Sequence, residues 1–252
     1  MAANGIFQGK TVMITGASRG LGRALSFAFA EQGAKLALSA RGEAALLQVK
    51  RELEELGAEV LAVAGDMSQA RDVERFVAIA EDTFGKLDVL INNAAMLGAS
   101  PMPLLLDYPE ADFAEVLRVN AVGPFLVTRR VLVNMLRHGQ GAVINVTSEA
   151  GRVGYAGWGA YGISKFALEG LTQTWADELS ETAVRVNMVD PGSMRTLMMA
   201  LADPDPDYEL ADPRDVTDVF LYLASDEGAG VNGQRFEAQA FIRPEGGGDD
   251  GR

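Results

Sequence analysis

The segment KTVMITGASRGLG, residues 10–22, decides the fold of this 252-residue chain. Its opening residues form an apolar run typical of a buried strand, and the glycines Gly16, Gly20 and Gly22 follow at once. Apolar residues then recur at helical spacing as far as Gly33, which indicates an amphipathic helix closed by a glycine. A glycine-rich turn that joins a strand to a helix is the setting in which such a pattern predicts nucleotide binding.

Strand-like runs and helical patterns alternate along the rest of the chain. Further strands are expected at residues 35–40, 59–64, 87–92, 142–147, 184–189 and 233–238. Helices are expected near residues 46–56, 73–84, 113–119, 124–136 and 214–224, with another that begins near Tyr161. The strands are apolar nearly throughout, as in a parallel sheet that is covered on both faces. The sequence therefore predicts a doubly wound α/β fold of the Rossmann type, with about seven parallel strands.

This alternation continues without a linker or an internal repeat, so we expect a single domain over residues 1–243. Residues 203–213 are rich in proline and carboxylates, which predicts an irregular loop. The last segment, PEGGGDDGR at 244–252, holds too few apolar residues to fold, and we expect it to be a loose tail.

The composition excludes several classes of function. The formal net charge is −13, whereas nucleic acids and anionic membranes attract surfaces rich in lysine and arginine. The chain has no cysteine and a single histidine, His138, which excludes disulfides and thiol catalysis and argues against a metal site. It shows neither a signal-peptide pattern nor the run of about 18 apolar residues that crosses a bilayer. We therefore expect a soluble cytoplasmic protein.

The glycine turn can hold the phosphates of a dinucleotide, because the N–H groups at the start of the following helix are free to bind anions. The alternative is a purely structural turn. An NAD-binding protein carries a carboxylate at the end of its second strand, whereas this strand ends in Ser39, Ala40 and Arg41. Arg41 and Arg19 can instead clamp a 2′-phosphate, since a guanidinium group matches phosphate geometry. We therefore expect NADP(H) in preference to NAD(H).

A second group of residues indicates proton transfer. Tyr161 and Lys165 are four residues apart near the start of a predicted helix, so both lie on one helix face. Ser148 follows the apolar run at 142–147, at the strand end where parallel sheets place their sites. A phenol, an ammonium group and a hydroxyl are suited to moving a proton on and off an oxygen atom. The YxxxK spacing alone is common, and a surface tyrosine on a helix is the alternative.

Taken in order, these residues resemble the motifs of the short-chain dehydrogenase/reductase family. The resemblance covers residues 8 to about 238 and is carried by Thr15–Gly22, Asp66, Asn92–Ala95, Asn120, Ser148, Tyr161, Lys165 and Pro191–Gly192. It implies a catalytic set of Asn120, Ser148, Tyr161 and Lys165. It also implies a cofactor-binding set of Gly16, Ser18, Arg19, Gly20, Leu21, Gly22, Arg41, Asp66, Met67, Asn93, Tyr161, Lys165, Pro191, Gly192 and Thr196.

The resemblance implies an NAD(P)(H)-dependent oxidoreductase that transfers a hydride between the nicotinamide and the carbon of a small-molecule carbonyl or secondary alcohol. Tyr161 would give or take the proton of the substrate oxygen, and Ser148 would orient that oxygen. Lys165 would hold the ribose and lower the pKa of the tyrosine, and Asn120 would hold a water in a proton relay to the lysine. Members of the family are usually tetramers or dimers, so a homo-oligomer is expected.

The same resemblance places Asp66 near the adenine, and the turn at Pro191 and Gly192, with Thr196, beside the nicotinamide. Two features depart from the family pattern. Family members commonly finish with an acidic residue and two glycines soon after the last strand. This chain instead reads Phe236-Glu237-Ala238-Gln239 and continues through Phe241 and Arg243, which puts the C-terminal contacts in doubt. Glu149, directly after the serine, is unexpected in an apolar pocket.

The substrate is expected among residues 94–104, residues 149–160 and the loop after Pro191. Apolar walls there can come from Met96, Tyr155, Trp158 and Met194. Two alternatives to the oxidoreductase stay open. One is an epimerase or dehydratase that uses bound NAD, although such chains are usually longer. The other is a non-enzymatic nucleotide sensor of the same fold, which usually lacks the tyrosine or the lysine.

Overall fold

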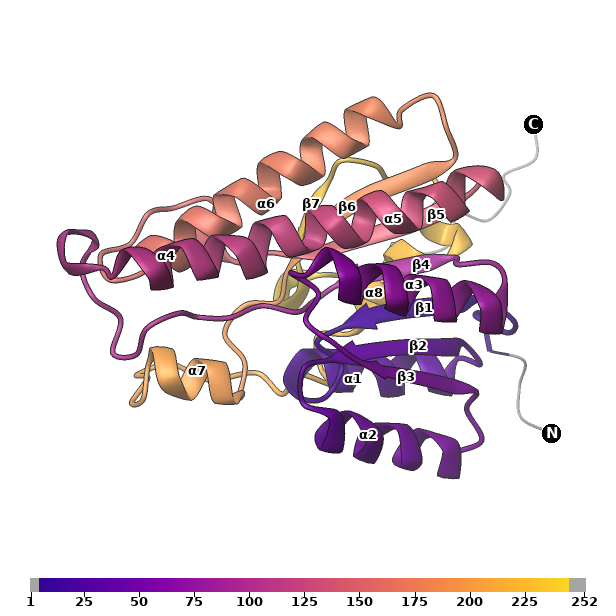
Figure 1. The fold of residues 1–252 in the computed structure, drawn as a ribbon, viewed down its shortest axis with the longest axis horizontal. Helices are drawn as coiled ribbons and strands as arrows, with labels where there is room; N and C mark the ends of the chain where they lie inside the picture. Colours follow the sequence, from indigo (N-terminus) through magenta and orange to yellow (C-terminus); the bar gives the residue numbers. More distant parts are fainter. Residues whose placement is uncertain (1–4, 245–252) are drawn as a thin grey trace.

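A computed structural model describes residues 5–244 of the chain (Figure 1). Within this range seven parallel strands form one sheet, in the order β3-β2-β1-β4-β5-β6-β7. The strands are β1 (Thr11–Thr15), β2 (Lys35–Ala40), β3 (Val60–Ala64), β4 (Val89–Asn92), β5 (Gly141–Val146), β6 (Val184–Asp190) and β7 (Arg235–Glu237). The predicted doubly wound α/β fold of the Rossmann type is confirmed.

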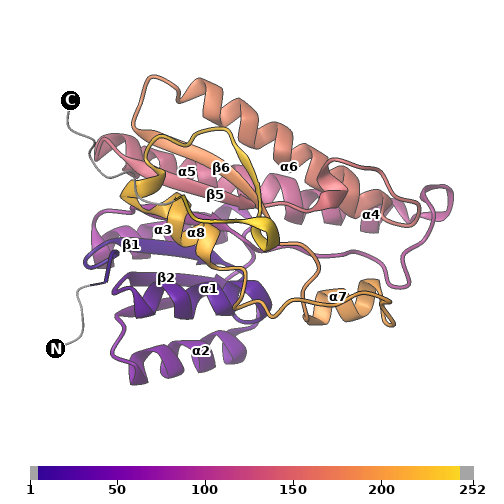
Figure 2. The same ribbon diagram turned by 180° about the vertical axis from the view of Figure 1, so that it is seen from behind.

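Helices cover both faces of the sheet, as Figures 1 and 2 show from opposite sides. One face packs against α1 (Gly20–Glu31), α2 (Glu43–Glu55) and α8 (Asp218–Ala224). The other packs against α3 (Ala70–Phe84), α5 (Gly123–Arg137) and α6 (Gly159–Glu178). Since both faces are covered, the residues of β1, β2 and β5 are buried almost without interruption, which explains the apolar runs in the sequence.

The glycines that the sequence places at helix ends adopt the conformation that such ends require. Gly33, Gly57 and Gly85 follow α1, α2 and α3 with φ angles of 83°, 85° and 75°. A side chain at these φ angles would be strained, so glycine closes each helix and lets the chain return to the sheet. These three boundaries are therefore correctly predicted by the sequence.

One long helical segment replaces two of the predicted helices. The structure joins α4 (Glu110–Leu117) to α5 through a π-helical turn, Arg118–Val122, so the expected break between residues 119 and 124 is absent from this described part of the chain. Pro124 has no N–H group to donate to the preceding turn, and the wider π-helical turn accommodates that loss.

The region after β6 also differs from the prediction. A short helix, α7 (Leu197–Ala202), was not predicted, and it stands apart from the two helix layers in Figures 1 and 2. Helix α8 begins at Asp218 rather than near residue 214, because Asp212 accepts the Arg214 N–H at 2.9 Å and holds a turn there. The expected tail at 244–252 lies outside the described residues, apart from Pro244.

The sheet reverses its order between β1 and β4, which lie side by side although β2 and β3 separate them in sequence. In an open parallel sheet such a switch point leaves a crevice at the carboxyl ends of the strands. The glycine turn, Ser148 and Pro191 all follow strands at this edge. Among the helices at residues 5–244, none combines the length and the apolar character that a bilayer span needs.

Candidate active site

The glycine turn has a backbone that only glycine can form at two positions. Gly16 and Gly20 have φ angles of 70° and 53°, in the left-handed region. A methyl group at Gly22 would overlap the carbonyl oxygen of Gly16, so the start of α1 packs directly on the turn. The Asn93 amide fixes the turn from below, because its Nδ2 donates to the carbonyls of Thr15 at 2.9 Å and of Gly16 at 3.1 Å.

The start of α1 is open to an anion. Its N-cap residue, Arg19, makes no side-chain cap hydrogen bond, and the first turn of the helix carries no acidic residue. The first N–H groups of the helix therefore face the cleft without a side-chain acceptor of their own helix. Such a helix start is suited to a phosphate.

A carboxylate, Asp66, follows β3. Asp66 accepts hydrogen bonds from the Ser68 N–H at 3.0 Å and from the Ser68 hydroxyl at 2.6 Å, and it lies 3.8 Å from Arg118. Partial burial raises the pKa of Asp66, but the Ser68 hydrogen bonds and the charges of Arg118 and Arg41 outweigh it and lower the pKa. Asp66 is thus held ionised close to Arg41.

These groups line one cleft of about 1650 Å³, which runs from the glycine turn to α7. Most of the predicted residues face it: Gly16, Ser18, Arg19, Gly20, Leu21, Arg41, Asp66, Met67, Asn93, Ser148, Tyr161, Lys165, Pro191, Gly192 and Thr196. Two do not. Gly22 is buried beneath the turn, and Asn120 lies behind the wall with 1% of its surface exposed.

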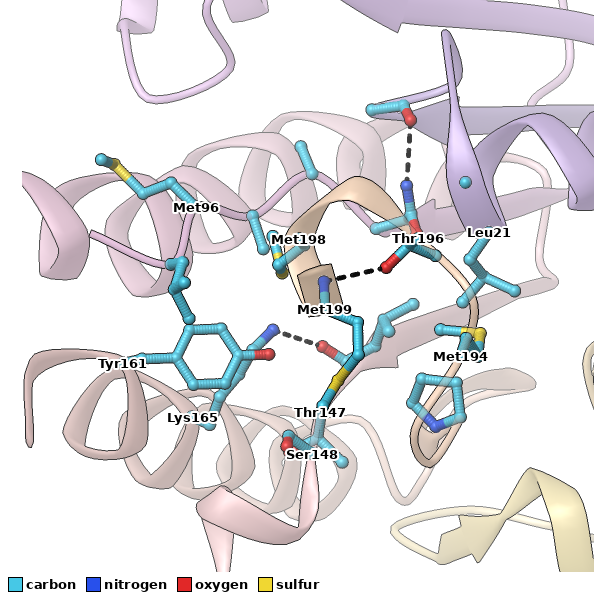
Figure 3. A pocket seen from close by; sticks show the side chains of 18 of the residues that line it. Leu21, Met96, Thr147, Ser148, Tyr161, Lys165, Met194, Thr196, Met198 and Met199 are labelled. Atoms are coloured by element: carbon cyan, nitrogen blue, oxygen red, sulfur yellow. Dashed lines mark hydrogen bonds between the residues drawn. The ribbon is translucent and has the colours of Figure 1, made fainter. Parts of the chain in front are cut away.

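Tyr161 and Lys165 lie on the buried face of α6, as their spacing predicts (Figure 3). The Lys165 Nζ atom is 5.4 Å from the centre of the Tyr161 ring and donates to the carbonyl of Val146, the last residue of β5, at 2.8 Å. Ser148 follows this strand and caps a short 3₁₀ turn, since its Oγ accepts the Ala150 N–H at 3.3 Å. The structure thus brings phenol, ammonium and hydroxyl together at the end of β5.

Burial shifts the pKa values of two groups at this site. Burial raises the pKa of Tyr161 to about 12; the Ser148 hydroxyl partly offsets the rise and the charge of Asp190 adds to it. Burial lowers the pKa of Lys165 to about 8, against the opposing charges of Asp190 and Glu169. In the protein alone, desolvation of the phenolate dominates the pKa of Tyr161. The expected lowering of this pKa beside the lysine and the oxidised nicotinamide stays a prediction.

Asn120 is held in the π-helical turn by hydrogen bonds that use both ends of its amide. Its Oδ1 accepts the Met96 N–H at 2.8 Å, and its Nδ2 donates to the Met96 carbonyl at 2.8 Å and to the Ser164 hydroxyl at 3.0 Å. The hydrogen bonds thus engage both ends of the side-chain amide, and the main-chain carbonyl is a separate acceptor. That carbonyl cannot accept the ordinary α-helical bond, because the residue four positions later is Pro124.

Comparison with known proteins agrees with this arrangement. The sequence profile described as short chain dehydrogenase matches residues 10–207. This chain belongs to the short-chain dehydrogenase family. Members of this family are NAD(P)-dependent oxidoreductases, so the expected class of protein is confirmed.

Three proteins illustrate the similarity of this chain to other family members. An uncharacterized oxidoreductase of Thermotoga maritima is 37% identical over 80% of this chain and 79% of its own. A 3-oxoacyl-[acyl-carrier-protein] reductase of the same organism is 34% identical over 90% and 95%. A solved structure from Shigella flexneri, assigned to the short-chain dehydrogenases and complexed with NADP, superposes with a TM-score of 0.88. It is 31% identical and covers 94% of this chain and 100% of its own.

The C-terminal segment of the chain contacts the site in a way that the sequence analysis did not predict. Arg235, the first residue of β7, donates to Asp190 at 2.8 Å and to Glu169 at 3.1 Å. Gln239 donates from one nitrogen to the carbonyls of Pro191 and Ser193, each at 3.0 Å. For Glu169 a signal was available, because it follows Lys165 by four residues and therefore lies on the same face of α6.

Apolar side chains form the other end of the cleft. All four predicted wall residues line it: Met96, Tyr155, Trp158 and Met194. Trp158 packs edge-on against the Tyr161 ring, with 5.7 Å between ring centres. Met198 and Met199 of α7, which were not predicted, lie opposite the tyrosine in Figure 3. The unexpected Glu149 lies beside the exposed Tyr155. A hydrogen bond with the Glu149 carboxylate raises the pKa of Tyr155.

Proposed function

We propose that the chain is an NADP(H)-dependent dehydrogenase/reductase that transfers a hydride between the nicotinamide and the carbon of a carbonyl or secondary alcohol, with Tyr161 as the acid/base. One observation carries the proposal: the buried Tyr161, beside Ser148 and Lys165, lines the same cleft as the glycine turn. A dinucleotide bound along that turn would extend toward the phenol. Hydride transfer and proton transfer would then take place within the same cleft.

The residues present fit a dinucleotide that carries a 2′-phosphate. The open start of α1 would bind the pyrophosphate, and Arg19 and Arg41 would bind the 2′-phosphate, since β2 ends without a carboxylate to repel it. Asp66 would lie near the adenine. The similar Shigella flexneri structure in complex with NADP supports this choice of cofactor.

When bound, the nicotinamide supplies or accepts the hydride. The residues of this chain would handle the proton. In reduction, Tyr161 is protonated at neutral pH because burial raises its pKa to about 12, and it would donate its proton to the carbonyl oxygen as negative charge develops there. Ser148 would hold the same oxygen by a hydrogen bond and fix its position. In oxidation the phenolate would take the proton back.

Lys165 would connect the phenol to solvent. Because burial lowers the pKa of Lys165 to about 8, its ammonium group can lose and regain a proton near neutral pH. A water held at the main-chain carbonyl of Asn120 would pass that proton on. The π-helical turn supports this role, because Pro124 leaves the Asn120 carbonyl without its α-helical partner.

The apolar end of the cleft supports a substrate whose carbonyl carries apolar groups. Trp158, Met96 and Met198 would pack against these groups, while Tyr161 and Ser148 hold the oxygen. We also propose that the chain assembles as a homo-oligomer, as members of its family usually do.

A panel of ketones and secondary alcohols tests the function, with NADPH consumption or formation followed by absorbance. We expect turnover of at least one apolar carbonyl with NADPH, at a lower KM for NADPH than for NADH. Binding of NADPH without turnover of any substrate would favour a nucleotide sensor. Equal use of NADPH and NADH would contradict the assigned cofactor. Conversion of a substrate without any net change in the nicotinamide would favour an epimerase or dehydratase.

A further inference from the structure

The loop after β6 is held from the C-terminal side by side chains that the reaction itself does not use. This loop, Asp190–Thr196, turns at Gly192, which has a φ of 70°. The Asp190 carboxylate accepts the Gly192 N–H at 2.9 Å from inside the loop. Since only one of the two carboxylate oxygens makes this contact, the second is available to a partner from elsewhere in the chain.

That partner is Arg235. Its Nη2 donates to the other oxygen of Asp190 at 2.8 Å, and its Nε donates to Glu169 of α6 at 3.1 Å. The same Nη2 lies 3.4 Å from the carbonyl of Ser148. The Arg235 side chain is 14% exposed and the two carboxylates 9% each, so the charges are largely shielded from water. A single guanidinium group therefore ties the loop to α6 and to the end of β5.

Gln239 holds the other side of the same turn. Its Nε2 donates to the carbonyls of Pro191 and Ser193, which flank Gly192, at 3.0 Å each. A methyl group at Gly192 would overlap the Gln239 amide, so the two residues are packed in direct contact. Gln239 itself lines the cleft. The turn is therefore clamped between Asp190 on one side and Gln239 on the other.

We propose that Arg235 and Gln239 are positioning residues that fix the Asp190–Thr196 loop in the conformation that receives the nicotinamide half of the cofactor. The proposal rests on the proposed function, because it requires a nicotinamide beside this loop. It also gives a role to the segment at 235–239, where the chain departs from the usual ending of its family. In this chain, the side chains of Arg235 and Gln239 from that segment would hold the loop.

Gln239→Met tests the proposal, because it keeps the length of the side chain and removes both hydrogen-bond donors. Calorimetry would measure the affinity for NADPH and for 2′-phospho-ADP-ribose, which lacks the nicotinamide. We expect the Kd for NADPH to rise about tenfold, as the loss of two hydrogen bonds implies, and the Kd for the truncated ligand to change less than about twofold. Gln234→Ala, an exposed glutamine on the same segment, serves as the control and should leave both constants unchanged.

Amide hydrogen exchange gives a second readout that needs no cofactor. In Gln239→Met, exchange at residues 192–196 should become faster, while exchange in β5 and α6 stays as in the parent chain. Arg235→Lys keeps the charge but cannot span Asp190 and Glu169, and it should accelerate the same amides. Unchanged NADPH affinity, or equal weakening of both ligands, would overturn the proposal. Failure of the parent chain to bind NADPH would instead overturn the proposed function and, with it, this proposal.

Discussion

The two ends of the cleft differ in the groups that they offer to a ligand: main-chain groups at one end and side chains at the other. At the β1 end, the glycine turn offers backbone N–H groups, and its shape follows from Gly16, Gly20 and Gly22 within one short segment. At the β5–β6 end, the groups are buried side chains from separate segments, with Tyr161 and Lys165 held among neighbouring charges. A site made of backbone is sensitive to added volume, whereas a site made of buried side chains is sensitive to lost functional groups. Substitutions at the two ends should therefore fail in different ways.

Tyr161→Phe gives the largest effect and bears on the side-chain end alone. Removal of the hydroxyl takes away the proton donor, so kcat should fall about 10³-fold, while the Kd for NADPH changes less than about twofold. Steady-state kinetics and calorimetry would measure the two quantities. Tyr222→Phe, at a buried tyrosine of α8 outside the cleft, is the matched control and should keep full activity. If Tyr161→Phe retained most of its turnover, another group would be the acid/base.

Gly22→Ala bears on the backbone end. The added methyl would meet the Gly16 carbonyl, and the turn would have to shift away from its anion-binding shape. The Kd for NADPH should rise about 100-fold, with a lower Tm. Gly170→Ala, on α6 with open space around the new methyl, should leave binding unchanged and raise the Tm. Normal NADPH binding by Gly22→Ala would remove the distinction between the two ends.

The pH dependence of the reaction sharpens the description of the side-chain end. With Tyr161 as the proposed base, oxidation of an alcohol needs its phenolate. Because burial raises the pKa of Tyr161 to about 12, the phenolate is the minor form below that pH and its population grows with pH. The oxidation rate should therefore rise by up to about tenfold per pH unit across the alkaline range, while the reduction rate should not rise there. Initial rates in both directions at several pH values would show this. An oxidation rate that is independent of pH would contradict a tyrosine base.

Arg41→Ala gives the smallest expected effect and concerns only the choice of nucleotide. Without this guanidinium the 2′-phosphate keeps Arg19 alone, so the preference for NADPH over NADH should fall about tenfold. The ratio of kcat/KM for the two cofactors is the measurement. Arg51→Ala, at an exposed arginine of α2, is the control. A preference that survives Arg41→Ala unchanged would assign the selectivity to other residues.

The backbone end was predictable because its information is local. A strand, three closely spaced glycines and a helix follow one another within residues 10–31, and the structure forms them as the pattern indicates. The same holds for Tyr161 and Lys165, whose spacing fixes them on one face of α6. Local periodicity was thus sufficient to predict the fold class, the succession of strands and helices along the chain, and the helix face that carries the phenol.

The side-chain end was only partly predictable, because its contacts join distant positions. Arg235 reaches Asp190 and Glu169 across 45 and 66 residues, and no periodicity in the sequence indicates those pairs. The raised pKa of Tyr161 likewise depends on burial, which the sequence does not state. Helix α7 was not predicted, for a different reason. Its signal was the N-cap Thr196, which accepts the Met199 N–H at 3.2 Å but was read only as a cofactor contact.

The contact between Trp158 and Tyr161 has an optical consequence. The chain contains two tryptophans, and the other, Trp175, stacks on Phe125 at 6.5 Å, away from the cleft. In a Trp175→Phe background, Trp158 would be the single indole emitter, 5.7 Å from the phenol ring. Ionisation of a phenol moves its absorption to longer wavelength, where it overlaps the short-wavelength edge of indole emission. Ionisation of Tyr161 would thus lower the emission of Trp158, and fluorescence would report the protonation state of the proposed acid/base.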